Sequence, residues 1–257
     1  MSGMQQGSVP AAARIRRVLS ATRARLQNQG AASGQTSETE VATPASRSRY
    51  ESTWTPSTEG DAKLLIYLTE SEESFAEGGR VDFQRLSPWF NEDATVLDLG
   101  CGIGRVARFV APECSKLWAV DVSERMLEMA AVRLSAFKNV SFVHSQDVSI
   151  PEVPDASVDL AYSLLVLQHL EREDAFLLLE ELRRLIKPSG TVVLSYPNLL
   201  ADGYLESFLQ YAHNGASTEP ARARFYTPQE VERILSAAGF RADIEAETEI
   251  RVVAHPV

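Results

Sequence analysis

The chain has 257 residues, of which 44% are hydrophobic, enough for a sizeable core in one large α/β domain or two small ones. Its formal net charge of −10 argues against a broad nucleic-acid-binding face, so DNA is not an expected partner, and no apolar run approaches the ~20 residues of a membrane-spanning helix. Two cysteines, Cys101 and Cys114, make no disulfide framework and indicate a reducing, cytoplasmic location.

Residues 1–59 are rich in Ser, Thr, Ala, Gly and Gln, which predicts a disordered extension. The charge is uneven, because residues 1–37 hold five arginines and no Asp or Glu, whereas the remainder has 20 basic against 35 acidic residues. Residues 11–27 could form an amphipathic helix. Three interpretations of this arm stay open: a loosely ordered extension, a helix that contacts a membrane surface or a partner, and an organelle transit peptide.

The folded domain is expected over residues 60–257, with short helices over 62–68 and 81–90 that Gly78 and Gly79 separate. Residues 95–99 then form a compact apolar run with one carboxylate, which predicts a buried strand. A turn with almost no side-chain bulk follows, and a helix is predicted over residues 104–110. A strand, a glycine turn and a helix N-terminus allow backbone N–H groups to approach a ligand closely.

The glycine spacing indicates the charge of that ligand. A dinucleotide-binding turn needs the pattern G-x-G-x-x-G, but Arg105 stands where its last glycine would be. The chain instead has D-x-G-x-G-x-G, with Asp98 two residues before the first glycine. A carboxylate there would repel a pyrophosphate and would attract a cationic ligand.

Strand and helix patterns alternate beyond this turn. Strands are predicted over residues 115–121, 140–144, 157–163 and 191–196, with helices after Ser123 and over 171–187. Residues 197–225 show no sustained period, residues 227–239 form a capped helix, and two strands are expected near 240–246 and 250–254. This alternation predicts a parallel sheet with helices on both faces, and such sheets bind ligands at the carboxyl ends of their strands. Four polar positions fall at such ends: Asp98, Asp121, Asp147 and Ser163.

These motifs resemble those of the class I S-adenosylmethionine-dependent methyltransferases. The stretch Thr95–Arg105 resembles motif I of that family, residues 157–170 its fourth-strand segment, residues 181–190 the helix and turn before its fifth strand, and residues 226–240 its last helix. The resemblance covers roughly residues 94–240. It implies a doubly wound, seven-stranded sheet whose last strand is antiparallel, and S-adenosyl-L-methionine as the cofactor. The domain then divides into a cofactor half, 94–196, and an acceptor-side insertion, 197–226.

The resemblance also implies the cofactor contacts. An acid at Asp121 would accept the ribose hydroxyls, although a helix-capping role is the alternative. Asp147 would take the adenine amino group, with Val148 packed on the ring, or would be a plain loop residue. A backbone carbonyl near Ser163 would meet the methionine ammonium. The implied cofactor-binding residues are Asp98, Gly100, Cys101, Gly102, Gly104, Asp121, Val122, Asp147, Val148 and Ser163.

Methyl transfer to an alcohol needs a base that accepts the hydroxyl proton. His169, just past the fourth strand, is the best candidate, although it could instead brace its loop. His213 is a weaker candidate, and His144, inside a strand, is expected to be structural. Arg224 and Tyr226 could reach the pocket, but a surface Arg and a core Tyr are the simpler interpretation. No residue pattern requires a metal.

The predicted function is methyl transfer to a small molecule, with an oxygen of a polar or glycosyl compound as the acceptor. An exocyclic amine on a base is disfavoured because no Asn/Asp-Pro-Pro-aromatic segment follows the fourth strand. Three alternatives remain. The first is a protein or RNA methyltransferase guided by the basic arm, the second a non-catalytic S-adenosylmethionine-binding protein, and the third an NAD enzyme. No pattern indicates an oligomeric state.

Overall fold

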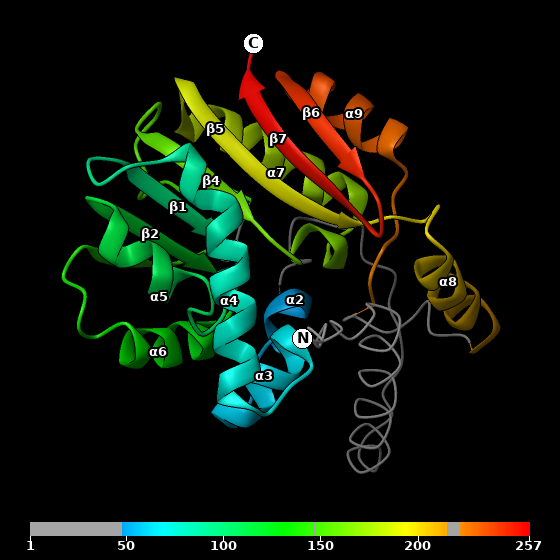
Figure 1. Cartoon of the computed structure of the whole chain (residues 1–257), viewed down its shortest axis with the longest axis horizontal. Coiled ribbons are helices and arrows are strands. Elements are labelled where there is room, and N and C mark those ends of the chain that lie inside the picture. Colours follow the sequence, from blue (N-terminus) through cyan, green and yellow to red (C-terminus); the bar gives the residue numbers. More distant parts are fainter. Residues whose placement is uncertain (1–47, 146–147, 215–221) are drawn as a thin grey trace, which may run out of the picture.

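The computed structural model describes residues 48–145, 148–214 and 222–257, whose strands form one seven-stranded sheet in the order β3-β2-β1-β4-β5-β7-β6 (Figure 1). The predicted amphipathic helix over residues 11–27 and Asp147 lie outside the described residues. The strands are β1 Thr95–Leu99, β2 Lys116–Asp121, β3 Val140–His144, β4 Val158–Ser163, β5 Ile186–Pro197, β6 Phe240–Ala246 and β7 Glu249–Pro256. The helices are α2 Ser48–Thr53, α3 Glu59–Tyr67, α4 Glu72–Leu86, α5 Ala107–Val110, α6 Glu124–Arg133, α7 Arg172–Leu185, α8 Asp202–Asn214 and α9 Pro228–Ala237.

Strands β1 to β5 pair in parallel, whereas β7 runs antiparallel to both β5 and β6. The predicted doubly wound sheet with an antiparallel last strand is therefore confirmed. Side chains along β1 alternate between two cores, as the period of a strand requires. Leu97 and Leu99 pack with residues of α7 and α9, while Val96 packs on the opposite face with residues of α4 and α5. Figure 1 shows these helices covering the two faces of the sheet.

The prediction that Gly78 and Gly79 separate two helices is wrong, because α4 runs through both. Each glycine sits where another segment lies against the helix. A Cβ at Gly78 would lie 2.3 Å from the Tyr67 ring, and one at Gly79 would lie 2.1 Å from the carbonyl oxygen of Arg105. Glycine at these two positions therefore allows α4 to pack directly against Tyr67 and against the backbone that follows the glycine-rich turn. Glycine here serves close packing and does not end a helix.

This contact predicts a large effect for a small substitution. Gly79→Ala should lower the free energy of unfolding by about 2 kcal/mol or more, because the methyl group can fit only if α4 or the turn moves. Gly60→Ala in the first turn of α3 is the matched control, since its Cβ would meet nothing closer than 3.8 Å. Urea unfolding of both variants checks the difference. Equal midpoints for the two variants would show that the close approach at Gly79 has no energetic weight.

Three boundaries differ from expectation. The helix predicted over residues 171–187 ends at Leu185, and β5 begins at Ile186, which pairs with Val158 of β4. Strand pairing thus outweighs the helical pattern of the last two residues. The helix after the glycine turn is shorter than predicted and covers only Ala107–Val110 before a 3₁₀ turn over Ala111–Glu113.

Two segments predicted to be irregular are helical. Residues 48–53, assigned to the disordered extension, form α2, whose Tyr50 is only 5% exposed and hydrogen-bonds to α7. Helix α8 lies in the acceptor-side insertion. Its buried Tyr204, Ser207 and Tyr211 face the protein, but Leu205 and Phe208 are exposed, so apolar residues on two faces obscure the helical period. Among the described residues, no helix has the length and apolarity needed to cross a membrane.

Candidate functional site

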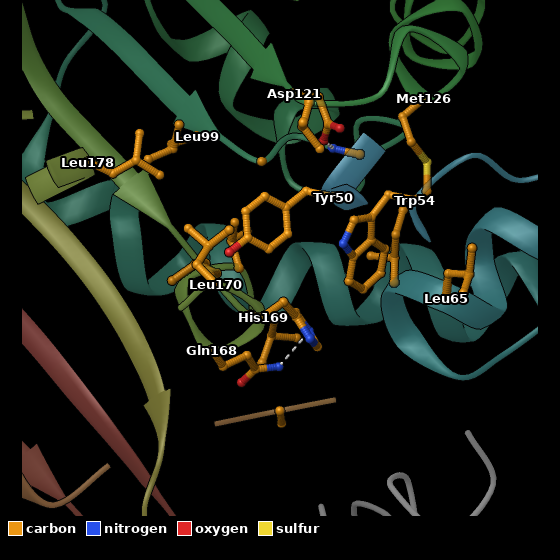
Figure 2. Close-up of a pocket in the computed structure, with 18 of the residues that line it drawn as sticks. Tyr50, Trp54, Leu65, Leu99, Asp121, Met126, Gln168, His169, Leu170 and Leu178 are labelled. Carbon is orange, nitrogen blue, oxygen red and sulfur yellow. Dashed lines mark hydrogen bonds between the residues drawn. The ribbon is translucent and has the colours of Figure 1, made fainter. Parts of the chain in front are cut away.

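A cavity of about 240 Å³ lies at the carboxyl ends of β1, β2 and β4. Figure 2 shows side chains entering it from several directions: Asp121 from the end of β2, Leu65 from α3, Gln168 and His169 from the loop after β4, and Tyr50 from α2. Helix α8 contributes Tyr204 and Tyr211. The cavity therefore joins the predicted cofactor half to the acceptor-side insertion.

The glycine-rich turn forms one wall. The N–H groups of Gly100 and Cys101 both donate to the carbonyl oxygen of Val120, at 2.8 and 2.9 Å, which ties the turn to β2. Gly100 has φ +81° and Gly102 has φ +54°, both in the left-handed region. A Cβ at Gly100 would lie 2.4 Å from Val166, and one at Gly102 would lie 2.6 Å from Ile66. Both glycines line the cavity, so bare backbone faces the ligand space there.

Asp121 also lines the cavity (Figure 2), and two backbone N–H groups donate to its carboxylate. Oδ2 accepts from the N–H of Gly102 at 2.8 Å, and Oδ1 accepts from the N–H of Ser123 at 2.9 Å. Burial raises the pKa of Asp121 above its ordinary value, and these two hydrogen bonds offset only part of that rise. Because each carboxylate oxygen can accept more than one hydrogen bond, the group can still bind a pair of hydroxyls.

Asp98 has a different place from the one expected. It is 4% exposed, it is not among the described residues that line the cavity, and its Oδ2 accepts from the hydroxyl of Tyr162 at 2.7 Å. Burial raises the pKa of Asp98 to about 7, although Tyr162 and the nearby Arg105 both lower it. The Asp98 side chain therefore joins β1 to β4 inside the protein, two residues before the turn.

This pKa predicts how stability depends on pH. The folded state keeps the proton of Asp98 up to about pH 7, whereas the unfolded state loses it near pH 4. The contribution of Asp98 to the free energy of unfolding should therefore fall as the pH rises from about 4 to about 7, by up to about 4 kcal/mol, and change no further above that range. Asp98→Asn removes the titrating group, so its Tm should decline less than that of the wild type between about pH 5 and pH 8. Parallel Tm curves would contradict this assignment.

Three other predicted residues also lie behind the cavity wall. Cys101, Gly104 and Ser163 are not among its described lining residues, and the Ser163 hydroxyl donates to the Leu99 carbonyl oxygen at 3.0 Å. That bond joins β4 to β1 below the turn. The neighbouring Leu164 does line the cavity, next to the position near which the sequence predicts a backbone carbonyl contact. Val122 and Val148 line it as expected.

Helix α2 covers the cavity and is tied to the loop that carries His169. The Tyr50 hydroxyl donates to Oδ2 of Asp174 at 2.7 Å and accepts from the N–H of Glu171 at 3.0 Å. The ring of Trp54 lies edge-on to that of His169, with 4.7 Å between centroids. Figure 2 places Tyr50 and Trp54 between Asp121 and His169. No motif of the sequence indicated either residue.

The orientation of His169 is fixed by its neighbours. Its Nε2 lies 3.0 Å from Nε2 of Gln168. Arg224, 6% exposed, donates from Nη1 to the His169 carbonyl oxygen at 2.7 Å and pairs through Nε and Nη2 with the carboxylate of Glu171. The interpretation of Arg224 as a surface residue is therefore wrong. Its buried guanidinium binds the loop of His169 and Glu171 and so stabilises it. Tyr226 is buried, as the core interpretation predicted.

The other histidines are distinguished by position. His144 Nε2 lies 2.9 Å from the carbonyl oxygen of Val122, which agrees with a structural role at the end of β3. His213 is exposed on α8 and is not among the described residues of the cavity wall. Within residues 48–145, 148–214 and 222–257, no group of three or more His, Cys, Asp or Glu side chains is arranged to hold a metal ion.

A family model described as a methyltransferase domain matches residues 80–244. The chain therefore belongs to this methyltransferase family, within the class I S-adenosylmethionine-dependent superfamily that the sequence motifs resemble. The matched residues include the glycine turn, the carboxyl ends of β1, β2 and β4, the loop of His169 and helix α8. They therefore include most of the residues that line the cavity.

Among individual proteins, the chain is 35% identical over 141 residues to a malonyl-[acyl-carrier protein] O-methyltransferase of Marinomonas sp., a match over 52% of this chain and 50% of that protein. It is 26% identical to a phosphoethanolamine N-methyltransferase of Plasmodium falciparum, over 59% and 55% of the two chains. The chain thus matches about half the length of these curated relatives. The magnesium protoporphyrin IX methyltransferase of Synechocystis has the same fold, with a TM-score of 0.61 at 18% identity over 82% of this chain and 99% of that one.

Proposed function

We propose that this protein transfers a methyl group from S-adenosyl-L-methionine to an oxygen atom of a small molecule. The observation that carries the proposal is the single cavity that joins Asp121 and the glycine turn to His169 and the tyrosines of α8. One end has the donors and acceptors that an adenosine needs, and the other has a candidate base. The size of the cavity, about 240 Å³, suits a small acceptor and not a long polymer.

The chain's residues fit the cofactor of the family. Asp121 would accept hydrogen bonds from the two ribose hydroxyls, and the bare backbone at Gly100 and Gly102 would allow close approach. Val122 and Val148 offer apolar surface to the adenine ring. The proposed contact of Asp147 with the adenine amino group concerns a residue outside the described ones.

When bound, S-adenosyl-L-methionine supplies a methyl group on a cationic sulfur, which keeps the bonding electron pair as the acceptor oxygen takes the methyl carbon. The protein's task is then to hold the acceptor in line and to exclude water. Tyr50 of α2 and Trp54, just after that helix, form part of the cavity wall. His169 accepts the proton that the acceptor hydroxyl loses.

The relatives support methyl transfer but not one acceptor atom, since one is named an O-methyltransferase and another an N-methyltransferase. The assignment of oxygen rests on His169, because a hydroxyl needs a base and a neutral amine does not. The polar or glycosyl acceptor expected from the sequence finds little support in the cavity wall, where Leu, Val, Ile and aromatic side chains predominate.

Incubation with methyl-labelled S-adenosylmethionine and a cell extract tests the proposal. We expect label in a small, organic-extractable product. Deleting residues 1–47 should preserve turnover, whereas deleting 1–59 should abolish it, because the longer deletion removes α2. Label in protein or RNA that disappears when residues 1–47 are removed would favour the alternative of an arm-guided enzyme. Cofactor binding without transfer to any component would favour a non-catalytic binding protein.

A further inference from the structure

The acceptor half of the cavity has a distinct composition. Tyr204 and Tyr211 of α8, Trp54 after α2 and Leu164 after β4 supply aromatic and aliphatic surface. Polar side chains are few there, with Gln168 and His169 on one loop. Aromatic walls of this kind favour a planar apolar ligand, because rings pack well edge-on and offset-stacked.

The charges of the wall have one sign. Within the described parts of the chain, the lining includes three carboxylates and neither Arg nor Lys. Asp121 serves the cofactor end, Asp174 accepts from Tyr50, and Glu249 lies at the start of β7, beside the end of β5. The described part of this wall therefore offers an anionic acceptor no Arg or Lys as a counter-charge.

Two arginines of the described chain lie near the acceptor side, and both are engaged elsewhere. Arg224 faces Glu171 and the carbonyl oxygen of His169 on the outer side of the loop. Arg172 pairs with Glu230 and lies over the ring of Tyr226, 5.0 Å from its centroid. A carboxylate or phosphate on the acceptor would therefore leave water without gaining an Arg or Lys partner among the described residues, which is strongly unfavourable.

We propose, on the basis of the proposed function, that the acceptor is an uncharged, mainly apolar phenol, and that acceptors with a carboxylate or phosphate group are excluded. The acidity of the hydroxyl that must lose its proton also favours a phenol over an alkyl alcohol. A phenolic hydroxyl has a pKa near 10, far below that of an alkyl alcohol, so a neutral imidazole at His169 can accept its proton as the methyl carbon is taken. The apolar wall and the base thus select the same class of molecule.

Calorimetry on the protein saturated with S-adenosylhomocysteine tests this inference without turnover. The ligands are phenol, para-propylphenol and β-naphthol, each compared with its carboxylated counterpart: para-hydroxybenzoate, para-hydroxyphenylpropanoate and hydroxynaphthoate. We expect at least one neutral phenol to bind, and its carboxylated counterpart to bind about 100-fold more weakly or not at all. Equal or tighter binding of the carboxylates, or no binding by any neutral phenol, would overturn the inference.

A variant that removes one negative charge from the cavity wall tests whether this charge excludes anionic ligands. Glu249→Gln should strengthen binding of the carboxylated ligands by about tenfold and leave the neutral phenols unchanged, because it removes one negative charge from the wall at almost constant size. Glu245→Gln, on the exposed side of β6, is the matched control and should change neither. An effect of the same size in both variants would contradict the inference. Failure of S-adenosylhomocysteine itself to bind would refute the proposed function instead, so the two failures are distinguishable.

Discussion

Replacing Asp121 with Asn is expected to weaken the binding of S-adenosylhomocysteine by at least about 100-fold. The wild-type carboxylate accepts from the N–H groups of Gly102 and Ser123 and can accept two further hydrogen bonds from a ribose. An amide has one acceptor atom, and its NH₂ group would face an N–H donor. Loss of two hydrogen bonds to a charged acceptor, at about 1.5 kcal/mol or more each, gives this factor.

Glu124→Gln is the control for this variant. Glu124 is exposed in the first turn of α6, three residues after Asp121, so its substitution removes the same charge from the same region without touching the cavity. Calorimetric titration of S-adenosylhomocysteine should give the wild-type affinity for Glu124→Gln. A similar loss in both variants would mean that general electrostatics, and not the contact at Asp121, governs binding. Thermal melts should accompany the titration, because Asp121 also holds the glycine turn.

Replacing His169 with Ala is expected to lower kcat for a hydroxyl acceptor by about 100-fold or more, with cofactor affinity unchanged. The ring lies between Gln168 and Trp54 at the acceptor side of the cavity, within a loop that Arg224 holds in place. Its backbone contacts do not depend on the imidazole, so the loop should persist in the variant. The loss should therefore appear in the chemical step.

Two measurements distinguish a catalytic base at His169 from a residue that only stabilises its loop. In the wild type, kcat should fall at acidic pH, where a catalytic base is protonated. This decline should be absent in His169→Ala. His213→Ala on the exposed face of α8 should behave as the wild type. If His169→Ala keeps the pH profile and changes only the acceptor KM, then His169 braces the loop and another group takes the proton.

Much of the fold could be predicted from the sequence because each strand carries its own local signal. The strands over Val140–His144 and Phe240–Ala246 agree with prediction to the residue, and the cap of α9 at Thr227 accepts from the N–H of Glu230 as the motif indicates. The failures have a common cause. Gly78 and Gly79 resemble a helix break, and the helical pattern before β5 extends too far, because only tertiary contacts decide both cases.

The site divides in the same way. Gly100 and Gly102 follow from the motif after β1, and Asp121 follows from its place at the end of β2. The structure places all three on the cavity wall. Tyr50 and Trp54 could not be predicted, because they belong to a segment whose composition resembles a linker and whose order depends on hydrogen bonds to α7. Arg224 was misjudged for a related reason: only the fold shows that its charge is used by Glu171.

The most direct test of the account is a calorimetric titration of the full-length protein with S-adenosylmethionine, S-adenosylhomocysteine and NAD. We expect the first two to bind with micromolar affinity and one-to-one stoichiometry, and NAD not to bind, because Arg105 occupies the position at which a dinucleotide-binding turn needs its last glycine. Binding of NAD in place of S-adenosylmethionine, or of none of the three, would contradict the assignment of this cavity as a methyl-transfer site.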